Sequence, residues 1–285
     1  MKIALLFSKQ RADTWGIYVE NALRKTKHEV YHFQPSDLSS LRNDFDLYFK
    51  IDDGNYNYDF PLHLKPKIYY VSDVHLKHAC KKIIRQARNY DIIFCALKEG
   101  VGKFQRLGIK SYWINAACDP QIHKKLTLPK IYDIGFVGTS GAIPRQFYLQ
   151  ALREKYPKSY IDLAPHTKMG EIYSQSKIGF SYPIKENCFT MRSCEILSCG
   201  TFLLMKNIKD ATDDTLEQLG FQDKKHLRIF HTPKEMFDII DYYLKNGAER
   251  ENIAQEGYLL IRKHHTYDDR VQEMLEIVRR ELTVF

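Results

Sequence analysis

The sequence contains no long hydrophobic run. Nothing in its 285 residues approaches the roughly eighteen consecutive apolar residues that indicate a transmembrane helix. The apolar stretch at residues 3–7 is too short for the core of a secretory signal peptide, and Ser8, Lys9 and Arg11 follow it where a cleavage site would need small residues. We therefore expect a cytoplasmic protein that is not an integral membrane protein.

Cysteine and glycine motifs are also lacking. The six cysteines form no CxxC motif and have no histidine at zinc-ligand spacing, so we expect neither a metal site nor a disulfide framework. The first strand leads into SKQRADTWG without a G-x-G-x-x-G fingerprint, and no acidic residue follows at the expected distance, which argues against a nicotinamide enzyme. Internal repeats and low-complexity segments are absent as well.

The composition is that of an ordinary globular protein with an excess of positive charge. Hydrophobic residues make up 44% and charged residues 27% of the chain. Lys and Arg total 43 against 35 Asp and Glu, a formal net charge of +8. This excess indicates an anionic partner, but it does not choose among a nucleotide diphosphate, an acidic lipid surface and a nucleic acid.

Short apolar runs alternate with helical patterns along the chain. Strands are expected at residues 2–7, 29–33, 45–51, 67–71, 91–96 and 111–115, and helices at 14–27, 75–89 and 98–107. A second series follows, with strands at 132–137, 159–163, 178–182, 201–205 and 227–230 and helices at 143–156, 168–176, 190–199, 233–244, 249–264 and 267–282. Such alternation predicts parallel sheets covered by helices on both faces.

The fold class that follows is α/β, with two tandem Rossmann-like domains at residues 1–125 and 126–285. Residues 116–130 contain Pro120 and Pro129 without periodicity and indicate an interdomain linker. We expect the last helix to return to the first domain. Because ligands of open α/β sheets bind outside the carboxyl ends of the strands, the active site is expected in the cleft between the domains.

The stretch FTMRSCEILSCGTFLLM at residues 189–205 combines a helix start, a helix stop and a buried strand. Thr190 can cap the helix, and Gly200 can take the left-handed conformation that ends it. Arg192 and Glu195 share a face near the helix start, where free N–H groups favour an anion. The pattern indicates a phosphate-binding helix end with a carboxylate beside it; a surface ion pair between Arg192 and Glu195 is the alternative.

Four blocks of sequence have a recognisable order and spacing. They are YDIIFCALKEGVGKFQRLGIKSYWINAACDPQIH at residues 90–123, YDIGFVGTSGAIPRQFYLQAL at 132–152, RSCEILSCGTFLL at 192–204 and RENIAQEGYLLIRKHHTYDDR at 250–270. Together these blocks resemble the CgeB-type (spore-maturation-protein-like) glycosyltransferases. The resemblance implies a GT-B fold, a nucleotide-sugar donor held mainly by the second domain, and sugar transfer without an obligatory metal ion.

The resemblance also implies roles on the donor side. Glu195 matches a carboxylate that accepts hydrogen bonds from the ribose hydroxyls, and Arg192 would neutralise the departing diphosphate. Many retaining relatives carry a second glutamate at a fixed spacing. Here the nearest upstream one, Glu186, is separated from Glu195 by eight residues, so the stereochemical outcome stays open.

The loop Gly138, Thr139, Ser140 and Gly141 follows an expected strand and precedes an expected helix. It is similar to the family's first donor-domain loop, where small residues let backbone N–H groups approach a phosphate, although a plain tight turn is the alternative. Arg145, in the next helix, could pair with the pyrophosphate or be a surface arginine. His166, which follows one expected strand, and Tyr182, at the end of the next, could flank the nucleobase.

On the first domain, Asp73 and His75 follow a strand, where the acceptor hydroxyl needs a general base or the donor sugar a polar contact. A helix cap and a surface imidazole are the alternatives for these two residues. Asp52 and Asp53 are rival candidates, although a DG turn explains Asp53. Asp119 and His123 match the family's CDP-x-x-H and are interpreted as residues that order the hinge.

The resemblance, together with the two Rossmann-like domains and the anion-binding helix, implies a glycosyltransferase. It would use a nucleoside diphosphate sugar such as a UDP-, GDP- or TDP-sugar and an unidentified glycan, protein or lipid acceptor. Two alternatives stay open: transfer to DNA or another polyanion, and a non-catalytic nucleotide-sugar-binding protein.

Overall fold

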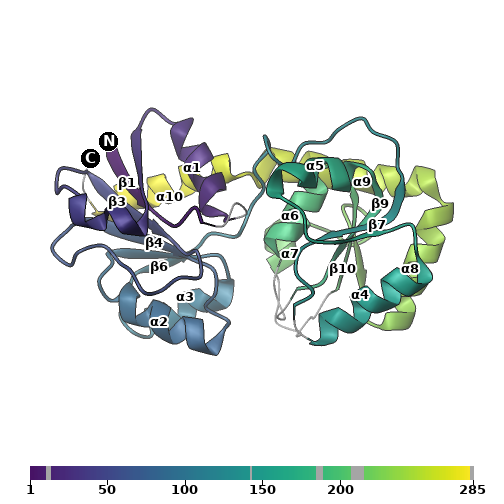
Figure 1. Ribbon diagram of the computed structural model, residues 1–285, viewed down its shortest axis with the longest axis horizontal. Coiled ribbons are helices and arrows are strands. Elements are labelled where there is room, and N and C mark those ends of the chain that lie inside the picture. The colour runs from purple at the N-terminus through teal and green to yellow at the C-terminus, as the bar shows by residue number, and fades with distance from the viewer. Residues whose placement is uncertain (11–13, 142, 184–188, 207–214, 283–285) are drawn as a thin grey trace. The chain divides into compact units, whose positions relative to one another are not determined.

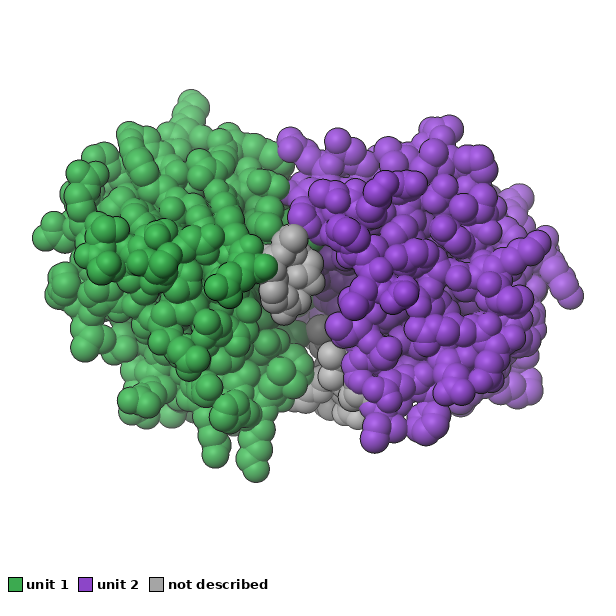
Figure 2. All heavy atoms as spheres, viewed as in Figure 1, with its two compact units in different colours: residues 1–115, 267–285 green, residues 116–266 purple. Residues whose placement is uncertain are grey.

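The computed structural model describes residues 1–10, 14–141, 143–183, 189–206 and 215–282. The chain forms two compact units, which Figure 2 shows in different colours. Unit 1 comprises residues 1–115 and 267–285, and unit 2 comprises residues 116–266. Each unit has its own sheet and its own buried core.

Unit 1 contains a sheet of six parallel strands. They are β1 (Lys2–Leu6), β2 (Glu29–Phe33), β3 (Leu47–Ile51), β4 (Lys67–Val71), β5 (Ile92–Cys95) and β6 (Ser111–Trp113), in the spatial order β2-β1-β3-β4-β5-β6. Since all pairings are parallel, all six strands end at the same edge of the sheet, here called the carboxyl edge. Every residue of β3, β4 and β5 is buried, as expected for central strands covered on both faces.

Helices cover the two faces of this sheet (Figure 1). They are α1 (Gly16–Arg24), α2 (Lys77–Ala87), α3 (Lys98–Gln105) and α10 (Tyr267–Leu282), together with the short 3-10 helix η1 (Pro35–Ser40). Helix α10 packs against α1, and Lys25 Nζ lies 2.8 Å from Asp268 Oδ1. The last helix of the chain therefore belongs to the first unit, as the sequence predicted.

Two lysines of the unit 1 sheet are fully buried. Lys50 Nζ donates to the Tyr58 carbonyl at 2.7 Å and to Gln86 Oε1 at 2.9 Å, and Lys67 Nζ donates to the Pro61 carbonyl at 3.2 Å. Burial lowers the pKa of both lysines. These bonds hold the segment after β3 against the sheet, because a buried ammonium group needs hydrogen-bond acceptors around it.

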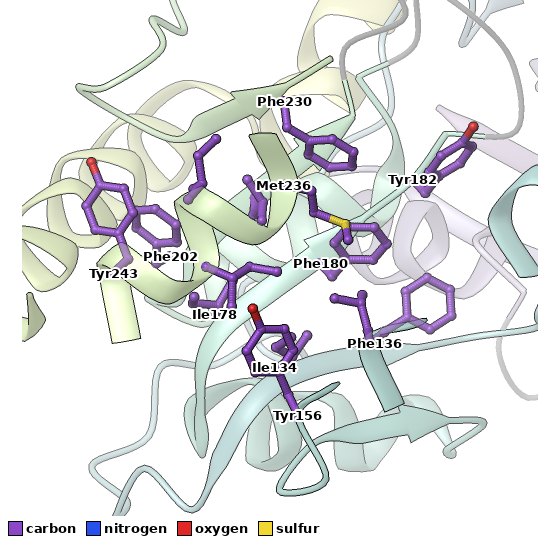
Figure 3. Close-up of a cluster of buried hydrophobic side chains, with 14 of the residues drawn as sticks. Ile134, Phe136, Tyr156, Ile178, Phe180, Tyr182, Phe202, Phe230, Met236 and Tyr243 are labelled. Carbon is purple, nitrogen blue, oxygen red and sulfur yellow. The ribbon is translucent and has the colours of Figure 1, made fainter. Parts of the chain in front are cut away.

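Unit 2 contains a sheet of five parallel strands. They are β7 (Tyr132–Val137), β8 (Tyr160–Asp162), β9 (Ser176–Ser181), β10 (Phe202–Lys206) and β11 (Arg228–Phe230), in the order β11-β10-β9-β7-β8. The helices are α4 (Ile143–Lys155), α5 (Met169–Ser174), α6 (Met191–Ser198), α7 (Thr215–Gln218), α8 (Pro233–Lys245) and α9 (Gly247–His264), with the 3-10 helix η2 (His166–Lys168). Aromatic and branched side chains fill the core, as Figure 3 shows for Phe136, Ile178 and Phe180.

This architecture confirms the predicted α/β fold class with two parallel-sheet domains in tandem. The division of the chain differs in detail from the predicted boundary at 125/126, because residues 116–125 belong to unit 2. There the Cys118 N–H donates to the His265 carbonyl at 3.2 Å, and Ser198 Oγ donates to the His123 carbonyl at 2.8 Å. The segment interpreted as a linker is thus tied into the second unit along part of its length.

Among the described residues, no helix combines the length and the hydrophobicity that crossing a membrane requires.

Candidate functional site

The loop after β7 has a backbone that only glycine adopts readily. Gly138 has φ +143° and Gly141 has φ +65°. The Gly138 N–H donates to the Asp162 carbonyl at 3.1 Å, which fixes the start of the loop beside β8. Thr139 and Ser140, between the two glycines, are exposed. The loop thus lies at the carboxyl edge of the unit 2 sheet, where the sequence placed it.

Arg192 lies across this loop. Its Nε donates to the Val137 carbonyl at 3.0 Å, and its guanidinium carbon lies 4.4 Å from the centre of the Phe136 ring. A β-carbon at Gly138 would be only 2.4 Å from Arg192 Nη2. Gly138 is therefore needed for two reasons, its backbone angle and the space that the guanidinium occupies.

Local sequence explains why α6 presents Arg192 there. Thr190 caps the helix by accepting from the Ser193 N–H at 3.3 Å, and Gly200 ends it with φ +67°. Both features were predicted from the sequence and are confirmed. Arg192 thereby lies in the first turn of α6, and it contacts β7 instead of forming the surface pair with Glu195 that was the alternative.

Arg145 reaches the same loop from α4. Its side chain is buried, with Nε donating to the Tyr182 carbonyl at 3.0 Å and Nη1 to the Thr139 carbonyl at 3.4 Å. Burial and the nearby positive charge of Arg192 lower the pKa of Arg145 to about 10. The interpretation of Arg145 as an idle surface arginine is therefore wrong.

The two arginines form a concentration of positive charge. Among the described residues, neither forms an ion pair with a carboxylate; their partners are backbone carbonyls and an aromatic ring. A carbonyl carries no formal charge, so it satisfies a donor without neutralising the cation. The loop from Gly138 to Gly141, with Arg192 at its first glycine and Arg145 at its second, is therefore suited to an anion, and most of all to one with several charges such as a diphosphate.

The Glu195 carboxylate is almost fully buried, whereas a carboxylate that binds a ligand has to be accessible to it. Its side chain is 3% exposed, and its Oε1 lies 3.7 Å from Nε2 of the fully buried His123. Ribose hydroxyls can reach its oxygens only if neighbouring side chains move. Contact of Glu195 with ribose therefore stays a prediction.

The sequence did not reveal that His123 lies beside Glu195. Its Nδ1 accepts the Asp119 N–H at 3.0 Å, and burial lowers its pKa to about 4. The CDP-x-x-H motif was the available signal, but it was interpreted as ordering a hinge. Spacing in the sequence could not show that this histidine meets Glu195.

The two residues expected to flank a nucleobase lie in different environments. His166 begins η2 and is half-buried, and its Nδ1 has no hydrogen-bond partner among the described residues. Tyr182 is 8% exposed and lies with the buried side chains of unit 2 (Figure 3). The centre of its ring is 4.9 Å from that of Tyr148. The structure therefore corrects the expectation of a Tyr182 ring open to a base: the residue contributes a core ring and the carbonyl that anchors Arg145.

In unit 1, Asp52 and Asp53 are used by the fold. Asp52 Oδ2 accepts the N–H groups of Ser72 at 3.0 Å and of Asp73 at 3.2 Å. Asp53 Oδ2 accepts the Ser8 N–H at 2.7 Å and the Tyr58 hydroxyl. These carboxylates join the ends of neighbouring strands, which explains them without a catalytic role.

The side chains of Asp73 and His75 form fewer hydrogen bonds with described residues than those of Asp52 and Asp53. Asp73 is half-buried and its Oδ2 accepts the Tyr56 hydroxyl at 3.4 Å, while His75 Nδ1 has no hydrogen-bond partner among the described residues. Burial and the adjacent Asp52 raise the pKa of Asp73. The cap of α2 is Leu76, so a capping role does not explain Asp73.

Glu186, considered as a second donor-side carboxylate, lies outside the described residues.

Two parallel-sheet α/β domains in tandem, with a last helix that joins the first, form the fold of the GT-B glycosyltransferases. A glycosyl transferase-like family profile matches residues 126–276, and the chain belongs to this family. The matched segment includes Gly138, Arg145, Arg192 and Glu195. No curated protein shows significant sequence similarity to the chain.

Several solved structures share the fold over nearly the whole chain. An α-glucosyltransferase (AGT) in complex with UDP superimposes with a TM-score of 0.72 at 12% identity, over 98% of this chain and 99% of that one. HepE (Alr3699) of Anabaena, in complex with UDP and glucose, gives 0.69 at 10% identity, over 98% and 100%. A DNA-modifying β-glucosyltransferase gives 0.66 at 14% identity, over 99% and 100%. At these identities the similarity establishes the GT-B fold.

Proposed function

We propose that this chain is a CgeB-type, cytoplasmic glycosyltransferase that takes its sugar from a nucleoside diphosphate sugar without a metal ion. The observation that carries the proposal is the pair Arg192, which lies against Gly138, and Arg145, which lies against Gly141 of the same loop. Among the described residues, neither has a carboxylate partner. A diphosphate provides the negative charge that this pair lacks.

Three features of unit 2 support binding of the diphosphate at this loop. Exposed Thr139 and Ser140 leave the backbone of the loop accessible, and the first turn of the capped helix α6 contributes N–H groups and a favourable dipole. The two guanidinium groups are held by carbonyls, so little reorganisation is needed when the anion arrives. We propose UDP as the nucleotide, because AGT and HepE are both described in complex with UDP.

The reaction breaks the bond between the sugar C1 and the diphosphate oxygen and forms a bond from C1 to an acceptor oxygen. The diphosphate leaves with the bonding electron pair, and Arg145 and Arg192 stabilise the charge that develops on it. The acceptor hydroxyl loses its proton to a base. We assign that role in unit 1 to Asp73, because Asp52 and Asp53 are occupied by backbone donors and the raised pKa of Asp73 suits a proton acceptor.

Binding of UDP-glucose, measured by isothermal titration calorimetry, tests the donor site. Loss of one charge-assisted hydrogen bond costs about 1.5–3 kcal/mol, so Arg192→Ala and Arg145→Ala should each weaken binding roughly 10- to 150-fold. Arg153→Ala is the matched control, because Arg153 also lies on α4 but donates to the Ile161 carbonyl. Unchanged affinity in both test variants would refute the proposed donor site.

The metal-independent part of the proposal has its own test. Transfer of glucose should continue at the same rate in excess EDTA, and a rate restored only by added divalent ions would refute it. The alternative of a non-catalytic binding protein predicts UDP-glucose binding with neither transfer nor hydrolysis above background.

DNA is a second candidate acceptor. The observation in its favour is that two of the structures with this fold are DNA-directed, the β-glucosyltransferase and AGT in complex with UDP and a 13-mer DNA. Incubation with UDP-[14C]glucose and either DNA or a mixture of glycans, followed by separation, distinguishes the two acceptor classes.

A further inference from the structure

The positive charge of the chain is concentrated in one segment of unit 1. Residues 74–110 contain nine Lys and Arg residues and only two acidic ones, Asp91 and Glu99. The formal net charge of this segment is therefore +7, compared with +8 for the whole chain. Both acidic residues are already paired, Asp91 with Lys65 at 2.7 Å and Glu99 with Lys103 at 3.2 Å. The excess charge in this segment is therefore not neutralised from within it.

Helix α2 arranges part of this charge as a stripe. Ala79, Ile83 and Ala87 are buried within unit 1. The opposite face presents four exposed cations, which are Lys77, Lys81 and Arg85 on the helix and Arg88 at its C-cap. At 100° per residue these four lie within an arc of about 80°. None of them forms an ion pair with a described residue. The stripe is about 16 Å long, from the rise of 1.5 Å per residue.

We propose that the basic face of α2, defined as Lys77, Lys81, Arg85 and Arg88, binds the phosphodiester backbone of a nucleic acid. One strand of duplex DNA carries a phosphate about every 3.4 Å along the axis, so a line of charge about 16 Å long faces about five phosphates. The cations are long, exposed side chains on a rigid helix, which suits backbone contacts that do not depend on base sequence.

An anionic membrane surface is the competing partner, and the structure favours it less. A helix that binds in a membrane interface buries its own apolar face among the lipids. In α2 that face, with Ala79, Ile83 and Ala87, is already packed inside unit 1. The exposed stripe is also narrow, which matches a line of phosphates better than a plane of headgroups.

The inference does not depend on the donor site, because α2 belongs to unit 1 and the arginine-lined loop to unit 2. Its test is fluorescence anisotropy of the full chain with a labelled 20-base-pair DNA at salt concentrations from 50 to 200 mM. Release of counterions from four phosphates predicts that Lys77→Gln, Lys81→Gln, Arg85→Gln and Arg88→Gln together reduce the slope of log K against log salt by about 3.6. At 50 mM salt the affinity should fall at least 100-fold.

The matched control removes the same four charges from exposed cations that are paired with carboxylates. These are Lys155 (with Asp241), Lys168 (with Glu171), Lys234 (with Asp238) and Arg280 (with Glu281). The quadruple glutamine control should keep the salt slope of the wild type. An equal loss in both quadruple variants shows that only net charge matters and overturns the inference.

Two further results also decide the inference. Binding of vesicles that contain phosphatidylserine, with no binding of DNA, overturns it in favour of a membrane. Thermal melting and UDP-glucose binding are measured on both variants. If the α2 variant keeps its melting temperature and its affinity for UDP-glucose while losing DNA, the result supports a separate nucleic-acid surface whatever the fate of the donor proposal.

Discussion

Nε2 of His123 lies 3.7 Å from Oε1 of Glu195, and both side chains are buried in unit 2. The Asp119 N–H donates to Nδ1 of the same ring at 3.0 Å, so a neutral His123 carries its proton on Nε2, facing the carboxylate. This contact links the CDP-x-x-H segment to the helix that bears Arg192. A second contact joins the same two segments, because Ser198 Oγ donates to the His123 carbonyl at 2.8 Å.

The pH dependence of stability should report on His123. Burial lowers its pKa to about 4, whereas an unfolded histidine titrates near 6.5. As the pH falls the unfolded state therefore binds its proton first, so stability is intact above pH 6.5 and is lost toward pH 4. The loss at pH 4 is about 3 kcal/mol, and His123→Gln should lack it.

Urea unfolding of the wild type and of His123→Gln at pH 7 and pH 4 measures this difference. His63→Gln, a change at an exposed histidine, is the control and should behave as the wild type. An identical loss of stability in wild type and His123→Gln would contradict the expectation.

The role of Glu195 can be tested with a modified nucleotide. If its carboxylate accepts the ribose hydroxyls, the wild type should bind UDP roughly 10-fold or more tightly than 2′-deoxy-UDP, because a hydrogen bond to a charged group is worth about 1.5–3 kcal/mol. Glu195→Gln should reduce the ratio of the affinity for UDP to the affinity for 2′-deoxy-UDP. If calorimetry gives the same ratio for both proteins, Glu195 supports the fold around His123 and does not contact ribose.

Gly138→Ala should impair donor binding through Arg192. The added methyl group would lie 2.4 Å from Arg192 Nη2, and the backbone at φ +143° disfavours alanine. We expect UDP-glucose affinity to fall at least 10-fold, with a loss of stability of about 1–3 kcal/mol. Calorimetry and urea unfolding measure the two effects.

Gly102→Ala is the control for that substitution, because a β-carbon there meets no atom within 4 Å and the residue lies inside α3. It should leave binding unchanged and stabilise the helix by up to about 1 kcal/mol. Equal binding by the Gly138 and Gly102 variants would show that the loop does not position Arg192 for the donor.

Asp73→Asn should slow sugar transfer without weakening donor binding. A positioned general base contributes typically about 10²- to 10⁴-fold in rate, so a loss of that size is expected. Burial and Asp52 raise the pKa of Asp73, so the transfer rate of the wild type should increase with pH around a midpoint that lies above the ordinary pKa range of aspartate. The rate of Asp73→Asn should not show this increase.

Initial rates measured across pH 4 to 8 test this expectation, with Asp44→Asn, at an exposed carboxylate of unit 1, as the control. If Asp73→Asn keeps full activity and His75→Gln is inactive, the general base is His75 and not Asp73.

Local features of the fold were accessible from the sequence. The cap at Thr190, the stop at Gly200 and the buried strands of unit 1 depend on hydrogen bonds and periodicities that span a few residues. The short helices η1, of six residues, and α7, of four, were not predicted, because segments of that length carry little periodicity. Tyr182 was placed at a base site because its position after a strand was visible and the direction of its ring was not.

The sequence by itself determined the two α/β domains, the glycine loop after β7 and the presence of Arg145 and Arg192 on the helices near it. Only the tertiary structure decided which of these groups meet: Arg192 reaches a carbonyl 55 positions earlier in the chain, and His123 lies against Glu195 inside unit 2. The physical reason is that such contacts depend on the order of strands and the packing of helices against them, which are set by burial of the whole core and not by neighbouring residues.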